Sequence, residues 1–269
     1  MEFRTIVDIP KPGFQIEPLE PILFVGSCFA DNIGKRFQEE RFPVTINPFG
    51  VMYNPASVHH TILQYKESPR IVFITLGTNH VYRLKETGEI VDNCQKRPQR
   101  LFQEEELTVD QCADYLSQTI QLLRSRNPEV HVVLTVSPIR YQKYGFHGSQ
   151  LSKATLLLAI DKVISHLSSP TLHPSSLTYF PAYEIVLDEL RDYRFYQPDM
   201  LHPSEQAVEY LWQQLVDAYF SPRAKDFLKE WKPVKDALHH RPFHPESDEY
   251  QKFLQQILLN EKELLARYA

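Results

Sequence analysis

The sequence predicts an α/β protein whose mostly parallel sheet is covered by helices on both faces. Short apolar runs of strand type alternate along the chain with stretches in which apolar residues recur every three or four positions. This alternation is typical of parallel strands joined by crossover helices. The runs at 70–76 and 130–137 are almost continuously apolar, as expected when both faces of a strand are buried.

The predicted strands end at turn residues. In chain order they lie at 22–25, 44–46, 70–76, 130–137 and 177–180, after a proline-punctuated lead-in. Gly26 and Gly77 end two of them, where a backbone without a Cβ atom can turn sharply. The segment 81–100 is expected to be an excursion of short strands around a Thr87-Gly88 turn.

The predicted helices follow from apolar spacing and from capping residues. They are expected from Phe29 onward, over 56–66, 108–126 and 151–168, up to Leu190, and over 205–220. In the first, Phe29, Ile33 and Phe37 recur at helical spacing. Thr108 and Gln111 suit a capping box at the start of the third. The aromatic segment 139–149 is expected to be a loop that overhangs a site.

The chain beyond Pro222 is charged and helical in pattern, with an interruption at 241–245 and a final helix around 248–268. We therefore expect a principal domain at 1–220 and a C-terminal helical extension at 221–269. The apolar stripe of the final helix predicts packing on the domain or on a partner.

Composition limits the classes of function. The 269 residues are 42% hydrophobic and 23% charged, with a formal net charge of -5, so no basic surface for nucleic acid or anionic membrane is expected. The N-terminus lacks the pattern of a signal peptide and no apolar run could span a bilayer, which predicts a cytoplasmic protein. Cys28, Cys94 and Cys112 have no metal-ligand spacing. Neither a metal nor a cofactor is implied, and the sequence leaves the oligomeric state open.

The turn after the first strand contains two nucleophile-type side chains, Ser27 and Cys28. They lie between the carboxyl end of a strand and the start of a helix, where α/β folds usually place their chemistry. The alternative is structural: a Ser that caps the helix, followed by a small buried Cys.

A second candidate site segment is Asp199-Met-Leu-His202, just before a helix. A carboxylate that hydrogen-bonds an imidazole fixes its tautomer and orients it as a general base. The alternative is an Asp at a helix entry with an exposed His. Because turns that follow parallel strands share one edge of the sheet, Gly50 and Asn79 are expected beside this pair.

With these residues the chain resembles the SGNH/GDSL hydrolase superfamily and, through Gly26-Ser-Cys-Phe-Ala30, the GSCFA-domain proteins of bacteria. The resemblance covers roughly 21–220 and implies a flavodoxin-like three-layer α/β/α sandwich. It further implies a nucleophile in the first sequence block, with Gly50 and Asn79 in the oxyanion hole and Asp199 and His202 as the fourth block.

The first block departs from the superfamily pattern. The usual order is Gly-Asp-Ser, whereas this chain has Gly26-Ser27-Cys28. Alignment on the glycine makes Cys28 the nucleophile, and alignment on the serine makes it Ser27. Because a shift of one residue reverses the direction of a strand side chain, only one alignment can hold, and we favour Cys28. A helix N-terminus and a nearby His are expected to lower the pKa of its thiol.

The resemblance implies an esterase or acyl transferase that acts on an ester or O-acyl group, with a carbohydrate as one candidate carrier. The rival is a non-catalytic module that binds an acylated or carbohydrate ligand in the same pocket. His80 and Arg194 are candidate substrate-binding residues; the alternatives are a half-buried structural His and a surface salt-bridge cluster. Asn93 and Cys94 are expected in the wall of the site.

Overall fold

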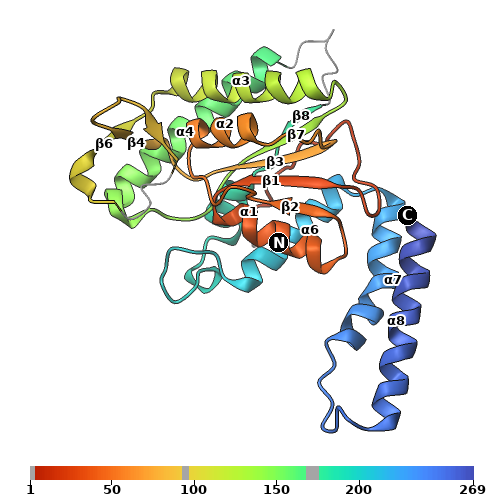
Figure 1. Ribbon diagram of the computed structural model, residues 1–269. Helices are drawn as coiled ribbons and strands as arrows, with labels where there is room; N and C mark the ends of the chain where they lie inside the picture. Colours follow the sequence, from red (N-terminus) through yellow and green to blue (C-terminus); the bar gives the residue numbers. More distant parts are fainter. Residues whose placement is uncertain (1–3, 93–96, 168–175) are drawn as a thin grey trace.

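The computed structural model describes residues 4–92, 97–167 and 176–269. Its central sheet has five parallel strands in the order β2-β1-β3-β7-β8 (Figure 1). The strands are β1 (Ile22–Gly26), β2 (Val44–Ile46), β3 (Ile71–Leu76), β7 (His131–Val136) and β8 (Leu177–Tyr179). This is the strand order of flavodoxin-like folds, so the predicted fold class is confirmed.

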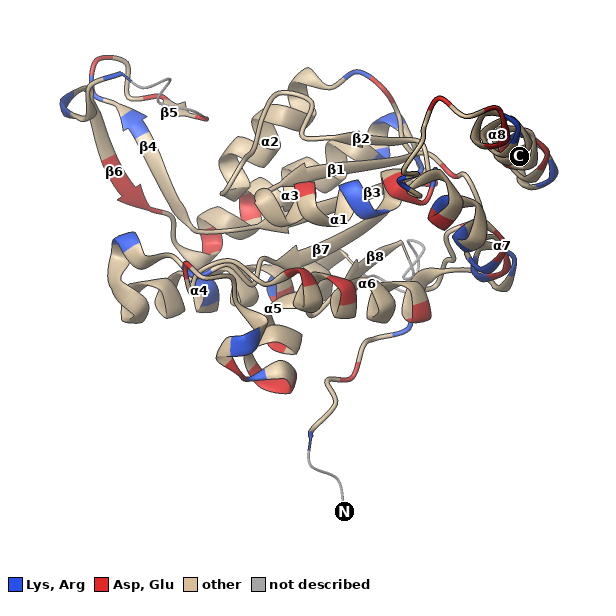
Figure 2. Ribbon diagram, turned by 90° about the horizontal axis from the view of Figure 1, so that it is seen from below, with Lys and Arg blue, Asp and Glu red and all other residues tan. Residues whose placement is uncertain are grey.

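Helices cover both faces of this sheet (Figures 1 and 2). One layer contains α2 (Pro55–Gln64), α3 (Val109–Arg126) and α4 (Gly145–Leu167), and the other contains α1 (Cys28–Glu39) and α6 (Glu205–Tyr219). The strands alternate between the two layers: Phe24 packs in the core with α1 and α6, whereas Leu23 packs in the core with α2, α3 and α4. The sheet is therefore buried between two apolar cores.

A small antiparallel sheet branches off after β3. It consists of β4 (His80–Leu84), β5 (Ile90–Val91) and β6 (Phe102–Glu106), with a 3-10 turn at Gln99–Leu101 before β6. The expected excursion of short strands is therefore present, but β6 was not predicted. Its sequence, Phe-Gln-Glu-Glu-Glu, has no apolar alternation, and it is stabilised by cross-strand pairs such as Arg83 Nε to Glu105 Oε2 at 2.8 Å.

Two helical segments differ from the prediction. Helix α4 begins at Gly145, after a 3-10 turn at Gln142–Tyr144, so much of the predicted aromatic loop is helical. Most of residues 145–150 are exposed and therefore show no apolar period. The helix expected up to Leu190 is one turn of α-helix, α5 (Ala182–Glu184), followed by a π-helix at Ile185–Leu190. A further 3-10 turn, Tyr193–Phe195, leads into the loop before α6.

The C-terminal helices α7 (Pro222–Leu238) and α8 (Asp248–Tyr268) form a hairpin that projects from the sandwich (Figure 1), which confirms the predicted helical extension. Its base is tied to α1: Trp231 Nε1 donates to the Glu39 carbonyl at 3.1 Å. Arg41 Nε lies 2.7 Å from Glu261 Oε1. The division of the chain into two domains at 220/221 stays a prediction. Among the described residues, no helix is long and apolar enough to cross a membrane.

Candidate functional site

The turn after β1 is fixed against β3. Gly26 has φ +141°, and a Cβ atom there would lie 2.0 Å from the Thr75 carbonyl oxygen, so only glycine fits. The Ser27 N–H donates to the carbonyl oxygen and to the Oγ1 of Thr75, at 3.0 and 2.9 Å. Contacts between the neighbouring strands β1 and β3 therefore set the position of the next residue, Cys28.

Ser27 and Cys28 differ in what their side chains contact. Ser27 is fully buried, and its hydroxyl lies 3.0 Å from Thr75 Oγ1 and caps α1 by accepting from the Phe29 N–H at 3.3 Å. Cys28 is half-buried and is the first residue of α1. The serine hydroxyl thus holds the turn in place, and the cysteine thiol is the more accessible of the two.

The surroundings of Cys28 raise the pKa of its thiol above the ordinary value. Burial is the main cause; amide N–H groups at the start of α1 and the positive charge of Lys153 act in the opposite direction, and the negative charge of Asp31 raises the pKa further. The expectation of a lowered pKa is therefore wrong, because desolvation of the thiolate outweighs the helix N-terminus.

Lys153 is a site residue that the sequence analysis missed. It is buried in α4, and its Nζ atom donates to the carbonyl oxygens of Gly77 and Ser137, both at 2.7 Å. Burial lowers the pKa of Lys153 to about 7, against the opposing effect of the Cys28 charge. The sequence does contain one signal for this residue: Lys153 shares the buried stripe of α4 with Leu156 and Ile160, and a charged residue on a buried stripe is unusual.

Two tyrosines complete this side of the site. The rings of Tyr53 and Tyr141 meet edge to face with centroids 6.3 Å apart. Burial and the charge of Cys28 raise the pKa of both hydroxyls, so both are neutral donors at pH 7. Tyr141 belongs to the segment that was expected to overhang the site, whereas Tyr53 comes from the loop before α2.

The Asp199–His202 pair lies on an exposed loop before α6. His202 Nδ1 is 2.6 Å from Asp199 Oδ2, which is the hydrogen bond that orients an imidazole. Asp199 Oδ1 accepts from the backbone N–H groups of Leu201 and His202, at 2.8 and 3.0 Å. These backbone donors, together with the His202 side chain, lower the pKa of Asp199 to about 2.

The loop is attached to the chain that follows β7. The Arg140 guanidinium donates to the Met200 carbonyl oxygen at 2.9 Å, and the Arg140 N–H donates to that of Leu201 at 3.1 Å. Among the described residues, no hydrogen bond or ion pair joins His202 to Ser27 or Cys28. The catalytic roles of these residues stay predictions.

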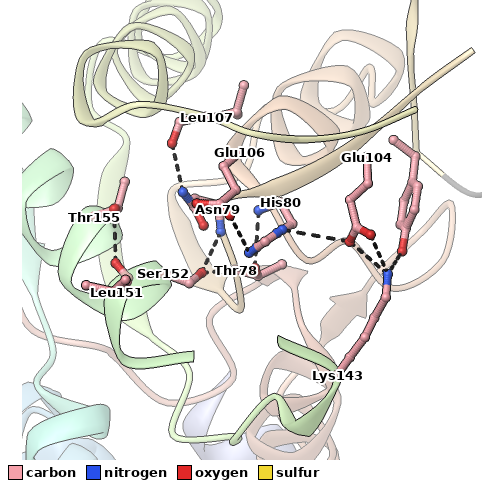
Figure 3. Close-up of polar contacts among 11 residues, drawn as sticks. Thr78, Asn79, His80, Glu104, Glu106, Leu107, Lys143, Leu151, Ser152 and Thr155 are labelled. Carbon is pink, nitrogen blue, oxygen red and sulfur yellow. Dashed lines mark hydrogen bonds and ion pairs between the residues drawn. The ribbon is translucent and has the colours of Figure 1, made fainter. Parts of the chain in front are cut away.

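The predicted oxyanion-hole donors already have acceptors within the protein. The Gly50 N–H donates to the Asn47 carbonyl oxygen at 2.8 Å. Asn79 Nδ2 donates to the Leu107 carbonyl oxygen at 2.8 Å, and its N–H donates to Ser152 Oγ at 3.0 Å (Figure 3). Asn79 Oδ1 is buried without a partner among the described residues. Participation of Gly50 and Asn79 in an oxyanion hole stays a prediction.

The two candidate substrate-binding residues have structural partners. His80 is buried and stacks on Tyr144 with ring centroids 3.6 Å apart. The Nδ1 atom of His80 lies 3.7 Å from Glu104 Oε1 (Figure 3). Arg194 is exposed, and its Nε lies 3.1 Å from Asp192 Oδ1. Their substrate roles stay predictions, and Asn93 and Cys94 lie outside the described residues.

The fold and this edge of the sheet define a flavodoxin-like α/β protein with a Ser-Cys turn after its first strand and an Asp-His pair before α6. The family model of the GSCFA family matches residues 21–70 and 59–215, and that of the C-terminal domain of GSCFA domain proteins matches residues 231–269. The chain belongs to the GSCFA family, as its pentapeptide predicted. No curated protein matches it.

Several solved structures are similar to the chain. A carbohydrate esterase family 3 structure from Talaromyces cellulolyticus is 12% identical, with a TM-score of 0.46 over 78% of this chain and 98% of that one. A family 3 carbohydrate esterase from Clostridium thermocellum is 12% identical, with a TM-score of 0.43 over 78% and 97% of the two chains. A family two carbohydrate esterase from the same organism, in complex with cellohexaose, is 11% identical, with a TM-score of 0.46 over 75% and 64%.

Proposed function

We propose that the protein is an SGNH-like hydrolase or acyl transferase that uses the Cys28 thiol as nucleophile on an ester or O-acyl group. The observation that carries this proposal is the division of roles in the turn. Ser27 is buried and holds the turn through Thr75 and α1, whereas Cys28 is half-buried at the first residue of α1. The resemblance of the family to SGNH hydrolases supports the same reaction class, and Ser27 remains the alternative nucleophile.

The raised pKa of Cys28 makes a general base necessary, because its thiol is protonated at neutral pH. His202 is suited to this role: Asp199 engages its Nδ1 and leaves Nε2 as the acceptor. Nε2 takes the thiol proton while Sγ forms a bond to the acyl carbon. Collapse of the tetrahedral intermediate expels the alcohol, which takes that proton, and water or another acceptor then cleaves the thioester.

This mechanism requires His202 to approach Cys28 when substrate binds, since catalytic hydrogen bonds often tighten only in the Michaelis complex. Backbone N–H groups at the start of α1 face the thiol and are placed to stabilise developing negative charge. Gly50 and Asn79 would exchange their present acceptors, Asn47 and Leu107, in order to contribute.

A non-catalytic binding module is the second candidate. It is favoured by the absence, among the described residues, of a hydrogen bond between His202 and Cys28. In that case the pocket holds an acylated or carbohydrate ligand without cleaving it. A carbohydrate carrier for the acyl group follows only from the family resemblance, and fold alone does not identify a substrate.

Hydrolysis of p-nitrophenyl acetate by the wild type and three variants tests the proposal. We expect Cys28→Ala and His202→Ala each to lower turnover on the order of 10⁴-fold, because nucleophile and base act as a unit. Ser27→Ala is the matched control: it retains turnover and loses about 1 kcal/mol of stability with its helix cap.

Covalent labelling separates the alternatives. Modification of Cys28 by iodoacetamide supports the thiol mechanism, and modification of Ser27 by a fluorophosphonate supports hydroxyl chemistry. Full turnover in His202→Ala contradicts the mechanism. If the wild type binds an acetylated oligosaccharide and cleaves no ester, the protein is the non-catalytic binding module.

A further inference from the structure

Tyr141 carries a hydrogen-bond donor without an acceptor in the buried side of the site. Its hydroxyl oxygen is buried and has no hydrogen-bond partner among the described residues. A buried polar group without a hydrogen-bond partner destabilises the folded state, because it has lost its bonds to water. An unsatisfied hydroxyl in a native site therefore calls for a functional explanation.

The hydroxyl lies directly on Gly77. A Cβ atom built at Gly77 would come within 2.3 Å of the Tyr141 hydroxyl oxygen. Gly77 follows β3 and is itself anchored, because its N–H donates to the Tyr53 carbonyl oxygen at 2.8 Å. Any side chain at this position would displace the hydroxyl, so the glycine after β3 provides the space that Tyr141 occupies.

Lys153 lies beside the ring of the same phenol. Its Nζ atom lies 5.1 Å from the centre of the Tyr141 ring and is fixed by the carbonyl oxygens of Gly77 and Ser137. A cation beside an aromatic ring interacts with its π electrons, and more strongly when desolvated. With a pKa of about 7, Lys153 is only partly charged at neutral pH, so its constant contribution is to position the phenol through its fixed Nζ atom.

The loop before α2 joins this hydroxyl to the turn that holds Cys28: the Met52 N–H donates to the Gly26 carbonyl oxygen, and the adjacent Tyr53 carbonyl oxygen accepts from the Gly77 N–H, both at 2.8 Å. A charge on Cys28 raises the pKa of Tyr141, in addition to the larger effect of burial. Tyr141 therefore keeps its proton at neutral pH and can donate it in a hydrogen bond. By contrast, the N–H of Gly50 and the amide of Asn79 already have acceptors.

We propose that the Tyr141 hydroxyl donates a hydrogen bond to the oxygen that becomes the oxyanion when Cys28 attacks an acyl group. Lys153 is the positioning residue for this hydroxyl, and Gly77 provides its space. The inference rests on the proposed function, because it assumes an acyl group bound at Cys28. It assigns Tyr141 as a catalytic residue, in addition to Cys28 and His202.

Tyr141→Phe tests the donor, because it keeps the ring and its contact with Lys153. We expect kcat for p-nitrophenyl acetate to fall by about 10²–10³-fold, the effect of removing one oxyanion-hole donor, with KM within about twofold. Tyr144→Phe is the matched control, since Tyr144 lies nearby with its ring centroid 6.2 Å from that of Tyr141, and its hydroxyl is directed to Glu104. Equal kcat in Tyr141→Phe and the wild type overturns the inference.

A reversible adduct with trifluoroacetone separates this inference from turnover. Sγ of Cys28 bonds to the ketone carbon, the carbonyl electron pair becomes the alkoxide, and the thiol proton passes to His202. Fluorine NMR measures the dissociation constant of this adduct, which should be on the order of 10²-fold higher in Tyr141→Phe than in the wild type. Equal affinity, or no adduct in the wild type, overturns the inference. A Tyr141-dependent adduct without ester turnover supports it and contradicts only the proposed hydrolysis.

Discussion

The two sides of the candidate site are held in place by different kinds of contact. On the Cys28 side, Lys153 is buried and binds carbonyl oxygens at the ends of β3 and β7. On the Asp199 side, the side chains of His202 and Asp199 are 38% and 42% exposed. The carboxylate of Asp199 binds backbone N–H groups only two and three residues away.

Because the two sides are held by different contacts, substitutions that affect folding stability should be distinguishable from substitutions that affect catalysis. A change on the buried side alters strand contacts and the burial of a charge, so it should affect the free energy of unfolding. A change in the exposed loop should affect the orientation of His202 and leave the core intact. The three predictions that follow test this separation, from the largest expected effect to the smallest.

Asp199→Asn should lower kcat/KM by about 10²–10⁴-fold with only a small fall in the midpoint of urea unfolding, because the lost charge is exposed to solvent. The Asn oxygen can still accept from the N–H groups of Leu201 and His202, so the loop is retained. Its amide would donate to Nδ1 of His202 and favour the wrong tautomer. Steady-state kinetics and urea denaturation measure the two effects. Unchanged turnover would show that His202 does not act as a base oriented by Asp199.

Gly26→Ala should lower the free energy of unfolding by about 2–6 kcal/mol, the sum of backbone strain and a clash in the core. The new Cβ atom would lie 2.0 Å from the Thr75 carbonyl oxygen at a φ of +141°. Gly88→Ala is the matched control, because it has φ +74° with no atom within 4 Å of its Cβ position. It should cost only about 1–2 kcal/mol. Equal losses in urea denaturation would mean that the turn after β1 is not tightly packed.

Lys153 should make stability rise between pH 7 and 8.5. Burial lowers its pKa to about 7 from an ordinary 10.5, so in this range the unfolded chain binds more protons than the folded one. Stability then increases with pH, by at most about 1.4 kcal/mol per pH unit. The range lies below the ordinary pKa of 9.0 of the Cys28 thiol, whose raised folded pKa acts in the opposite sense at higher pH.

The rise of stability between pH 7 and 8.5 should disappear in Lys153→Met. Lys162→Met is the matched control on the same helix: Lys162 is exposed, and Asp110 raises its pKa. Urea denaturation at several pH values measures the slope for each protein. A wild-type slope equal to that of Lys153→Met would show that the lysine stays charged in the folded protein throughout this range.

The parts of the fold that the sequence predicted are those with a local signal. The apolar run that forms β3, the capping box at Thr108 and the spacing in α1 each lie within one short segment. The strand β6 was missed because its stability depends on pairing with β4, including the Arg83–Glu105 ion pair. The start of α4 was missed because its first turn is largely exposed.

The candidate site likewise contains features with a local sequence signal and features that depend on distant contacts. The hydrogen bond between Asp199 and His202 joins residues three positions apart, so their spacing was enough to predict it. Lys153 was not predicted as a site residue, and Tyr141 was expected only as part of a loop that overhangs the site. Their relation to Cys28 depends on the order of the strands and on the packing of α4. No local pattern encodes which distant residues meet at the edge of a sheet.

The sequence by itself therefore determined the α/β class, the alternation of elements, the Ser-Cys turn and the Asp-His loop, because each depends on backbone preferences and apolar period within a few residues. Only the tertiary structure decided that the Ser27 hydroxyl contacts Thr75, that burial raises the pKa of Cys28, and that the Gly50 and Asn79 donors are engaged. These properties depend on strand register and desolvation, which arise only when distant segments pack together.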